Sequence, residues 1–233
     1  MKICLFGIPE VNPGRINVND PRLDEADRLV EAKKKTYAQI EAVDEKELLT
    51  SDAVLTNLDG KLELIFKDVD FIETRLSRDA QEAEKAVLLK IKAALESDKL
   101  MMEAGLTPEE TSAIVAHAFH TGKPIVVASK EELAEPEAVM VRVVAEAGWI
   151  SFLTVGGKEN RAWLIRKGTT ALEAAGSIHS DMQKGFIRAE ILSYADFIEA
   201  GGETQAKRAN KVRLETKNYV MQDYDLTNFR FNK

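Results

Sequence analysis

The stretch Arg161–Ile191, RAWLIRKGTTALEAAGSIHSDMQKGFIRAEI, decides how the last third of this chain folds. An apolar run that ends at Arg166 predicts a strand. Thr170, with Glu173 three residues later, forms the pattern of a capping box and predicts the start of a helix. The residues from Gly185 to Ile191 predict another strand. Strand, helix and strand in so short a stretch indicate a small α+β unit.

The flanking residues extend this unit to residues 149–233, which begin after the helix-breaking Gly148. A short helix is predicted near Tyr194–Ala200, and strands are predicted at 212–215, 219–222 and 226–231. The unit carries 13 Lys/Arg against 10 Asp/Glu, whereas the first 148 residues carry 19 against 29. This mildly basic balance is compatible with RNA contact and too weak for a dedicated nucleic-acid binder. No DNA partner is expected.

The composition is that of a soluble globular protein. The chain has 233 residues, of which 45% are hydrophobic and 30% charged. No apolar run approaches the roughly 20 residues of a membrane span, and MKICLFGIPE is not typical of a secretory signal. Cys4 is the only cysteine, which fits a reducing compartment. We expect a cytoplasmic protein without a membrane partner.

The first 148 residues predict an α/β body interrupted by helices. Four short apolar runs read as buried strands: Lys2–Ile8, Tyr37–Val43, Ala53–Leu58 and Pro124–Ala128. Between them, apolar residues at helical spacing predict helices over about Leu62–Ser77 and Asp79–Met102, paired as a hairpin. A third helix is predicted from Thr107 to about Phe119. The expected division is therefore 1–60 with 120–148 as the body, 61–119 as a helical insertion, and 149–233.

The opening stretch, continued by YVMQDYDLTNFRFN at Tyr219–Asn232, resembles the C-terminal TGS-like domain of the YchF/Obg-like ATPases. The segment Asn19–Asp24, NDPRLD, resembles a part of the same family that lies beyond its switch I. The resemblance implies a truncated P-loop GTPase-like sheet with a helical hairpin insertion. It also implies a C-terminal α+β domain of TGS-like, β-grasp fold.

The phosphate-binding loop of that family is absent from the sequence. A P-loop requires G-x-x-x-x-G-K-[ST], because its backbone amides, lysine and hydroxyl hold the phosphates and magnesium. Here the first strand is followed by Gly7 and, seven positions later, Gly14, and then by Arg15 and Ile16. The resemblance gives further relics of nucleotide motifs at Gly7, Asp44, Ser129 and Glu132. We therefore expect no catalytic residues, no cofactor and no enzyme.

Two other groups of residues are candidate sites. His117 and His120 lie on the predicted third helix and are expected to be packed rather than to bind a metal. Arg166, Lys167, Lys184 and Arg188 flank glycines, an arrangement that suits RNA phosphates or is simply a charged surface.

The resulting hypothesis is a non-catalytic YchF-like protein that binds RNA, the ribosome or a translation factor through its C-terminal domain. One alternative is a diverged protein with residual ATP or GTP binding. The other is a protein-interaction module that uses the helical hairpin and binds no RNA. The residues do not separate the first hypothesis from the last.

Overall fold

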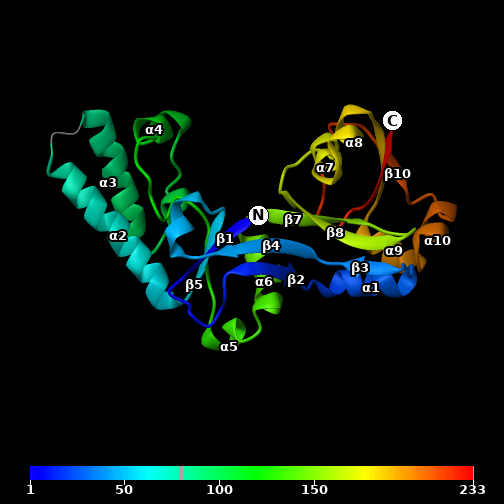
Figure 1. Ribbon diagram of the computed structural model, residues 1–233. Coiled ribbons are helices and arrows are strands. Elements are labelled where there is room, and N and C mark those ends of the chain that lie inside the picture. The colour runs from blue at the N-terminus through cyan, green and yellow to red at the C-terminus, as the bar shows by residue number, and fades with distance from the viewer. Residues whose placement is uncertain (79–80, 233) are drawn as a thin grey trace. The chain divides into compact units, whose positions relative to one another are not determined.

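The computed structural model describes residues 1–78 and 81–232 (Figure 1). The fold is mixed α/β with two sheets, in agreement with the expected class. The chain forms two compact units. Unit 1 comprises Met1–Ile16 and Ile40–Val139, and unit 2 comprises Asn17–Gln39 and Met140–Lys233. The three-part division expected from the sequence remains a prediction.

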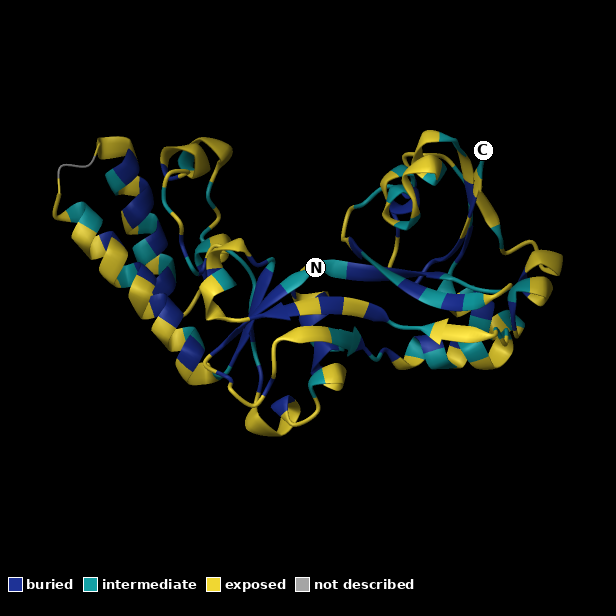
Figure 2. Cartoon of the chain, in the orientation of Figure 1, coloured by how far each residue is buried: buried dark blue, intermediate teal, exposed yellow. Residues whose placement is uncertain are grey.

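A five-stranded sheet forms the centre of unit 1, in the order β2-β4-β1-β5-β6. Strand β1 pairs in parallel with β4 and β5, and β5 pairs in parallel with β6. The strands are β1 (Lys2–Phe6), β2 (Gly14–Val18), β4 (Ala38–Val43), β5 (Ala53–Thr56) and β6 (Ile125–Val127). Burial on both faces explains why β1 and β5 are continuous apolar runs (Figure 2).

The predicted helical hairpin is present as α2 (Leu58–Leu76) and α3 (Glu82–Glu96). The facing sides of the two helices are buried, and their outer sides are exposed (Figure 2). Helix α2 begins four residues earlier than predicted, because the side chain of Asn57 caps it by accepting from the Gly60 amide at 2.8 Å. Helix α3 ends before the predicted Met102, and the predicted start at Asp79 lies outside the described residues.

Helix α4 (Pro108–Ala113) is much shorter than predicted. Its capping box at Thr107 is present, but the helix ends before Ile114. Ile114 and Phe119 are both buried in the hairpin core, and turns between them allow both side chains to reach it. The expectation that His117 and His120 lie on this helix is therefore wrong.

Unit 2 is built on a six-stranded sheet in the order β10-β9-β11-β7-β8-β3. Strands β7 and β8 form an antiparallel pair, and β11 pairs in parallel with β7 and antiparallel with β9. The strands are β3 (Lys34–Thr36), β7 (Trp149–Thr154), β8 (Glu159–Arg166), β9 (Phe186–Leu192), β10 (Arg213–Glu215) and β11 (Leu226–Phe231). The strand predicted at 219–222 is reduced to a single bridge between Thr170 and Val220.

Helices cover this sheet. Helix α7 (Ala171–Ile178) starts at the predicted capping box, and its alanines pack on Phe152 and Ile165. Helix α1 (Pro21–Leu29) contacts β8 through Asp27, which accepts from the Asn160 amide at 2.7 Å. The predicted helix at Tyr194–Ala200 is α9. The remaining helices are α5 (Lys130–Leu133), α6 (Pro136–Glu146), α8 (Ser180–Lys184), α10 (Glu203–Arg208) and the 3₁₀ turns η1 (Glu45–Thr50) and η2 (Met101–Glu103). In the described part of the chain, no helix combines the length and apolar character needed to cross a membrane.

Candidate functional site

The carboxyl edge of the five-stranded sheet gathers the relic nucleotide-motif residues. Gly7 follows β1, Asp44 follows β4, and Ser129 and Glu132 follow β6. These three strands run in parallel, so their carboxyl ends share one edge. This is the edge at which ligands bind in open α/β sheets. The assignment of these residues as relics of a nucleotide site remains a prediction.

A hollow of about 450 Å³ lies at this edge between the loop after β1 and the turn after β4. The backbone of Gly7 has φ of 64°, a conformation that favours glycine. Its amide donates to the Glu45 carboxylate at 3.0 Å, and its carbonyl accepts from the Asn57 side chain at 3.1 Å. The position that an anion would take on the Gly7 amide is therefore held by a carboxylate of the chain itself.

The other relic positions serve as helix caps. The Asp44 carboxylate accepts from the Lys46 amide at 2.9 Å and so caps η1. Ser129 and Glu132 form a reciprocal capping box on α5, with hydrogen bonds of 2.8 and 3.3 Å. Each of these polar groups thus has a local structural partner. Nearby, burial raises the pKa of the Cys4 thiol to about 11, which makes it a packing residue rather than a thiolate.

The two histidines of the hairpin region bind acidic side chains. His117 Nε2 lies 2.8 Å from Glu84, and His120 Nδ1 lies 2.7 Å from the buried Asp68. Among the described residues, no group of three or more His, Cys, Asp or Glu is arranged to hold a metal ion.

The four basic residues predicted to bind RNA lie at two ends of the six-stranded sheet. Arg166 pairs with Trp149 at the start of β7, and Lys167 follows it. Arg188 of β9 pairs with Arg230 of β11. Arg230 lies four positions after Leu226, the residue of β11 that pairs with Leu153 of β7. Along the direction of the strands, Arg188 therefore lies about eight residue positions from Arg166. This is about 26 Å at a strand rise of about 3.3 Å per residue. Arg166 and Lys167 are adjacent in sequence and Lys184 and Arg188 are four positions apart, and the strand register keeps the two pairs separate.

Some exposed cations of unit 2 form ion pairs and others do not. Arg230 is paired with Glu190 and Lys211 with Asp196. Within residues 1–78 and 81–232, no ion pair is found for Lys167, Lys184 or Arg188, all of which are exposed. Exposed cations without a carboxylate partner are suited to contacts with phosphates.

Gly185, beside Lys184, has a structural role of its own. A Cβ at this position would lie 2.0 Å from the backbone oxygen of Asn232, so only glycine permits the two backbones to approach. This glycine is explained by packing and does not by itself indicate a phosphate site.

A cluster around Arg22 could not be read from the sequence. Arg22 contacts Asp20 and Asp223 at 2.7 Å each and lies 3.6 Å from the centre of the Tyr224 ring. Burial lowers the pKa of Arg22, but the hydrogen bonds to the two carboxylates outweigh burial and raise it. Tyr224 is buried and has φ of 62°, rare for a residue with a side chain. The cluster joins residues 201 positions apart, which no local pattern predicts.

The outer face of α2 presents a further surface. Leu58, Leu62 and Phe66 are 60, 39 and 67% exposed and lie at intervals of four residues on one side of the helix. Protein binding through this hairpin remains a prediction.

Most of the chain is similar in sequence to known proteins. A family model named YchF-GTPase_C, described as "Protein of unknown function (DUF933)", matches residues 149–232. The "Ribosome-binding ATPase YchF" of Bacillus subtilis (strain 168) is 31% identical over 270 residues, covering 83% of this chain and 74% of that protein. The "Obg-like ATPase 1" of Pongo abelii is 52% identical over 81 residues, covering 35% of this chain and 20% of that protein. The solved YchF GTPase of Schizosaccharomyces pombe shares the fold, with a TM-score of 0.74 at 18% identity over 99% of this chain and 97% of that chain.

These relatives correct one expectation. The altered phosphate loop led us to expect that the chain is not an enzyme. The relatives that span most of the chain are named as ATPases, and the structural neighbour is named as a GTPase. The chain's kinship is thus with nucleotide-hydrolysing proteins, and the expectation is contradicted.

Proposed function

Because this chain belongs to the family of YchF and Obg-like ATPases, we propose that it associates with the ribosome in the cytoplasm through RNA contacts of unit 2. The relatives over most of its length are named as ribosome-binding. The observation that carries the proposal is that Lys167, Lys184 and Arg188 are exposed and form no ion pair in the described part of unit 2. Such cations contact phosphates without reading sequence.

The finer domain assignment is part of this proposal. A TGS-like, β-grasp fold for residues 149–233 is supported by the β7–β8 hairpin, helix α7 and the parallel pairing of β11 with β7. A truncated P-loop sheet is supported by the direct passage from β1 to β2, with no helix between them in the described chain. The helices of residues 61–119 are proposed as an insertion.

Ribosome co-sedimentation of the full chain at low and high salt tests the proposal. The protein should pellet with ribosomes at low salt and be released as salt rises, because phosphate contacts displace condensed counterions. Charge reversal of Arg166 and Lys167, or of Lys184 and Arg188, should lower the bound fraction. The two double variants identify which end of the sheet carries the contact.

A matched variant of the hairpin separates RNA contact from protein contact. Phe66→Asp disrupts the exposed apolar face of α2 and leaves the basic pairs intact. If Phe66→Asp abolishes pelleting and both charge reversals leave it unchanged, the ribosome contact is a protein contact through the hairpin and the RNA proposal is wrong.

We propose nucleotide binding at the carboxyl edge of the five-stranded sheet as a second function, since the family is named for it. The Glu45 carboxylate accepts from the Gly7 amide at 3.0 Å and would repel a phosphate there. Glu45→Gln keeps the shape of the side chain and removes its charge. Calorimetric titration with Mg-ATP should show tighter binding to Glu45→Gln than to the wild type.

Glu41→Gln provides the control, because this exposed residue of β4 changes the net charge equally without touching the loop. An equal gain in both variants would mean that net charge, rather than this loop, governs binding. No gain in Glu45→Gln would remove the loop from the nucleotide site.

A further inference from the structure

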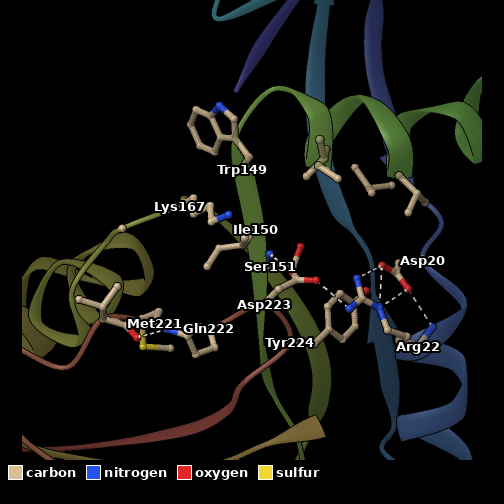
Figure 3. Close-up of a pocket in the computed structure, with 16 residues that line it drawn as sticks. Asp20, Arg22, Trp149, Ile150, Ser151, Lys167, Met221, Gln222, Asp223 and Tyr224 are labelled. Carbon is tan, nitrogen blue, oxygen red and sulfur yellow. Dashed lines mark hydrogen bonds and ion pairs between the residues drawn. The ribbon is translucent and has the colours of Figure 1, made fainter. Parts of the chain in front are cut away.

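Unit 2 contains a cavity of about 520 Å³ that the functions above do not use (Figure 3). Its volume falls within the range of about 300–1,000 Å³ typical of small-molecule sites. Val144 and Ala145 of α6 and Trp149 and Ile150 of β7 supply apolar walls, and Met221 lies across from them (Figure 3). All of its lining residues belong to one compact unit, so the cavity is a property of that unit alone.

One side of the cavity is closed by polar groups that already have partners. Asp20 and Asp223 both pair with Arg22, and Asp223 also accepts from the Ser151 amide at 3.0 Å (Figure 3). The Arg22 guanidinium packs on the ring of Tyr224. These groups form a fixed wall of two carboxylates and one guanidinium, which carries one net negative charge. They do not supply a free cation for an anionic ligand.

Lys167 supplies that cation at the opposite side. Its side chain is exposed, lines the cavity and has no ion-pair partner within the described residues (Figure 3). An anionic group at the cavity mouth would find this ammonium without having to displace a carboxylate.

Trp149 provides a large aromatic surface and an unused donor. Its ring is held by the Arg166 guanidinium, whose carbon lies 4.8 Å from the ring centre. Its indole Nε1 is buried without a hydrogen-bond partner in the described structure. An indole N–H usually finds an acceptor when buried. Because this nitrogen is enclosed by the protein, a ligand in the cavity meets the ring of Trp149 and not its N–H. A nucleobase offers a flat face that can stack on this ring, and an aliphatic ligand does not.

We propose that this cavity binds a nucleoside 5′-phosphate unit, with the base against Trp149 and the phosphate on Lys167. The bound nucleotide can be free, or it can be an unpaired nucleotide of an RNA strand. Base–aromatic stacking contributes about 1–3 kcal/mol per base, enough to hold one nucleotide within a larger RNA contact. The RNA source rests on the proposed ribosome association, but the cavity itself does not.

The two tryptophans of the chain give the test its internal control. Trp163 donates its indole N–H to Thr154 at 3.0 Å and does not line the cavity. The ¹⁵N-labelled full chain is titrated with nucleoside monophosphates, with the matching nucleosides, and with single-stranded RNA pentamers. The indole signal of Trp149 should shift saturably, and that of Trp163 should stay in place.

Three variants locate the ligand. Lys167→Ala should weaken binding of the monophosphates about tenfold, the loss of one charge-assisted contact, and leave nucleoside binding unchanged. Ala145→Trp places a bulky side chain at an exposed lining position of α6 and should abolish the shift. Ala138→Trp, an exposed position two turns earlier that does not line the cavity, should leave it unchanged.

The outcomes are distinct. Shifts with the pentamers at lower concentration than with the monophosphates identify RNA as the source, and the reverse identifies a free nucleotide. No shift of Trp149 with either class at millimolar concentration overturns the proposal, as does a shift that persists in Ala145→Trp. Ribosome pelleting is measured separately, so a failed cavity and a failed ribosome association are told apart.

Discussion

At the scale of single residues, Tyr224 is the most unusual position in the chain. It is 2% exposed at φ of 62°, a backbone conformation that costs a residue with a Cβ about 1–2 kcal/mol relative to glycine. The packing of its ring offsets this cost: Arg22 lies on its face, and Tyr194 meets it edge-on at 5.7 Å between ring centres. The contacts of the Tyr224 ring therefore stabilise a backbone conformation that tyrosine otherwise disfavours.

Substitution of Tyr224 separates the two effects. Tyr224→Ala should lower the free energy of unfolding by about 3–5 kcal/mol, because it empties a packed site. Tyr224→Gly should be more stable than Tyr224→Ala by about 1 kcal/mol, the reverse of the usual order of these residues. Urea unfolding of both variants measures the difference. A more stable alanine variant would mean that the left-handed backbone at this position is wrong.

Gly185 offers a second test at this scale. Gly185→Ala should destabilise unit 2, because the added methyl group would lie 2.0 Å from the backbone oxygen of Asn232. Gly122→Ala is a matched control, since its nearest neighbour would be at an ordinary 3.4 Å. Thermal unfolding of the two variants should show a loss only for Gly185→Ala. Equal melting temperatures would refute the close approach of the two backbones.

At the scale of elements, the hairpin is tied to the segment after α4 by one buried carboxylate. Asp68 of α2 accepts four hydrogen bonds, from the amides and side chains of His120 and Thr121, at 2.6–3.0 Å. Asp68→Ala should cost about 3 kcal/mol or more, because buried donors lose their acceptor. Asp70→Ala, at an exposed position of the same helix, should stay within about 0.5 kcal/mol of the wild type. Denaturant unfolding compares the two, and equal stabilities would contradict the buried network.

The second contact of the hairpin depends on pH. Hydrogen bonds from Arg75 and His117 lower the pKa of Glu84 from 4.5 to about 2. A carboxyl whose pKa is lower in the folded state stabilises the fold fully above its unfolded pKa. This contribution is then lost as the pH falls from about 4.5 towards 2.

Glu84→Gln removes the titrating group and should flatten this part of the acid unfolding curve. Glu82→Gln, at a position whose side chain is 91% exposed, should keep the wild-type curve. Circular dichroism between pH 6 and 2 follows the helices directly. A wild-type curve in Glu84→Gln would assign the acid sensitivity to other groups.

The same elements show what the sequence could and could not predict. The buried strands of unit 1, the hairpin and the capping box at Thr170 follow from periodicity and local hydrogen-bonding residues, and all are present. Helix α4 is shorter than the sequence predicts, because burying both Ile114 and Phe119 stabilises the fold more than continuing the helix would. Three features could not be predicted: the separation of the two basic pairs, the Arg22 cluster and the cavity. They depend on strand register and on contacts between residues far apart in sequence, which no local pattern contains.

At the scale of the whole molecule, we propose that unit 2 carries the contact with the ribosome. Unit 2 includes Asn17–Gln39 as well as Met140–Lys233, so the segment with Arg22 belongs to the same unit as the basic residues. Unit 1 contributes the acidic sheet edge, where Glu45 lies on the Gly7 amide, and an acidic edge repels phosphates.

Ultraviolet cross-linking of the full chain bound to ribosomes, with mapping of the RNA-linked peptides, tests this claim most directly. We expect RNA-linked peptides from unit 2, including the segment with Arg166 and Lys167 and the cavity residue Trp149. The Arg166→Glu, Lys167→Glu double variant should lose these links. RNA-linked peptides confined to residues 1–16 and 40–139 would contradict it.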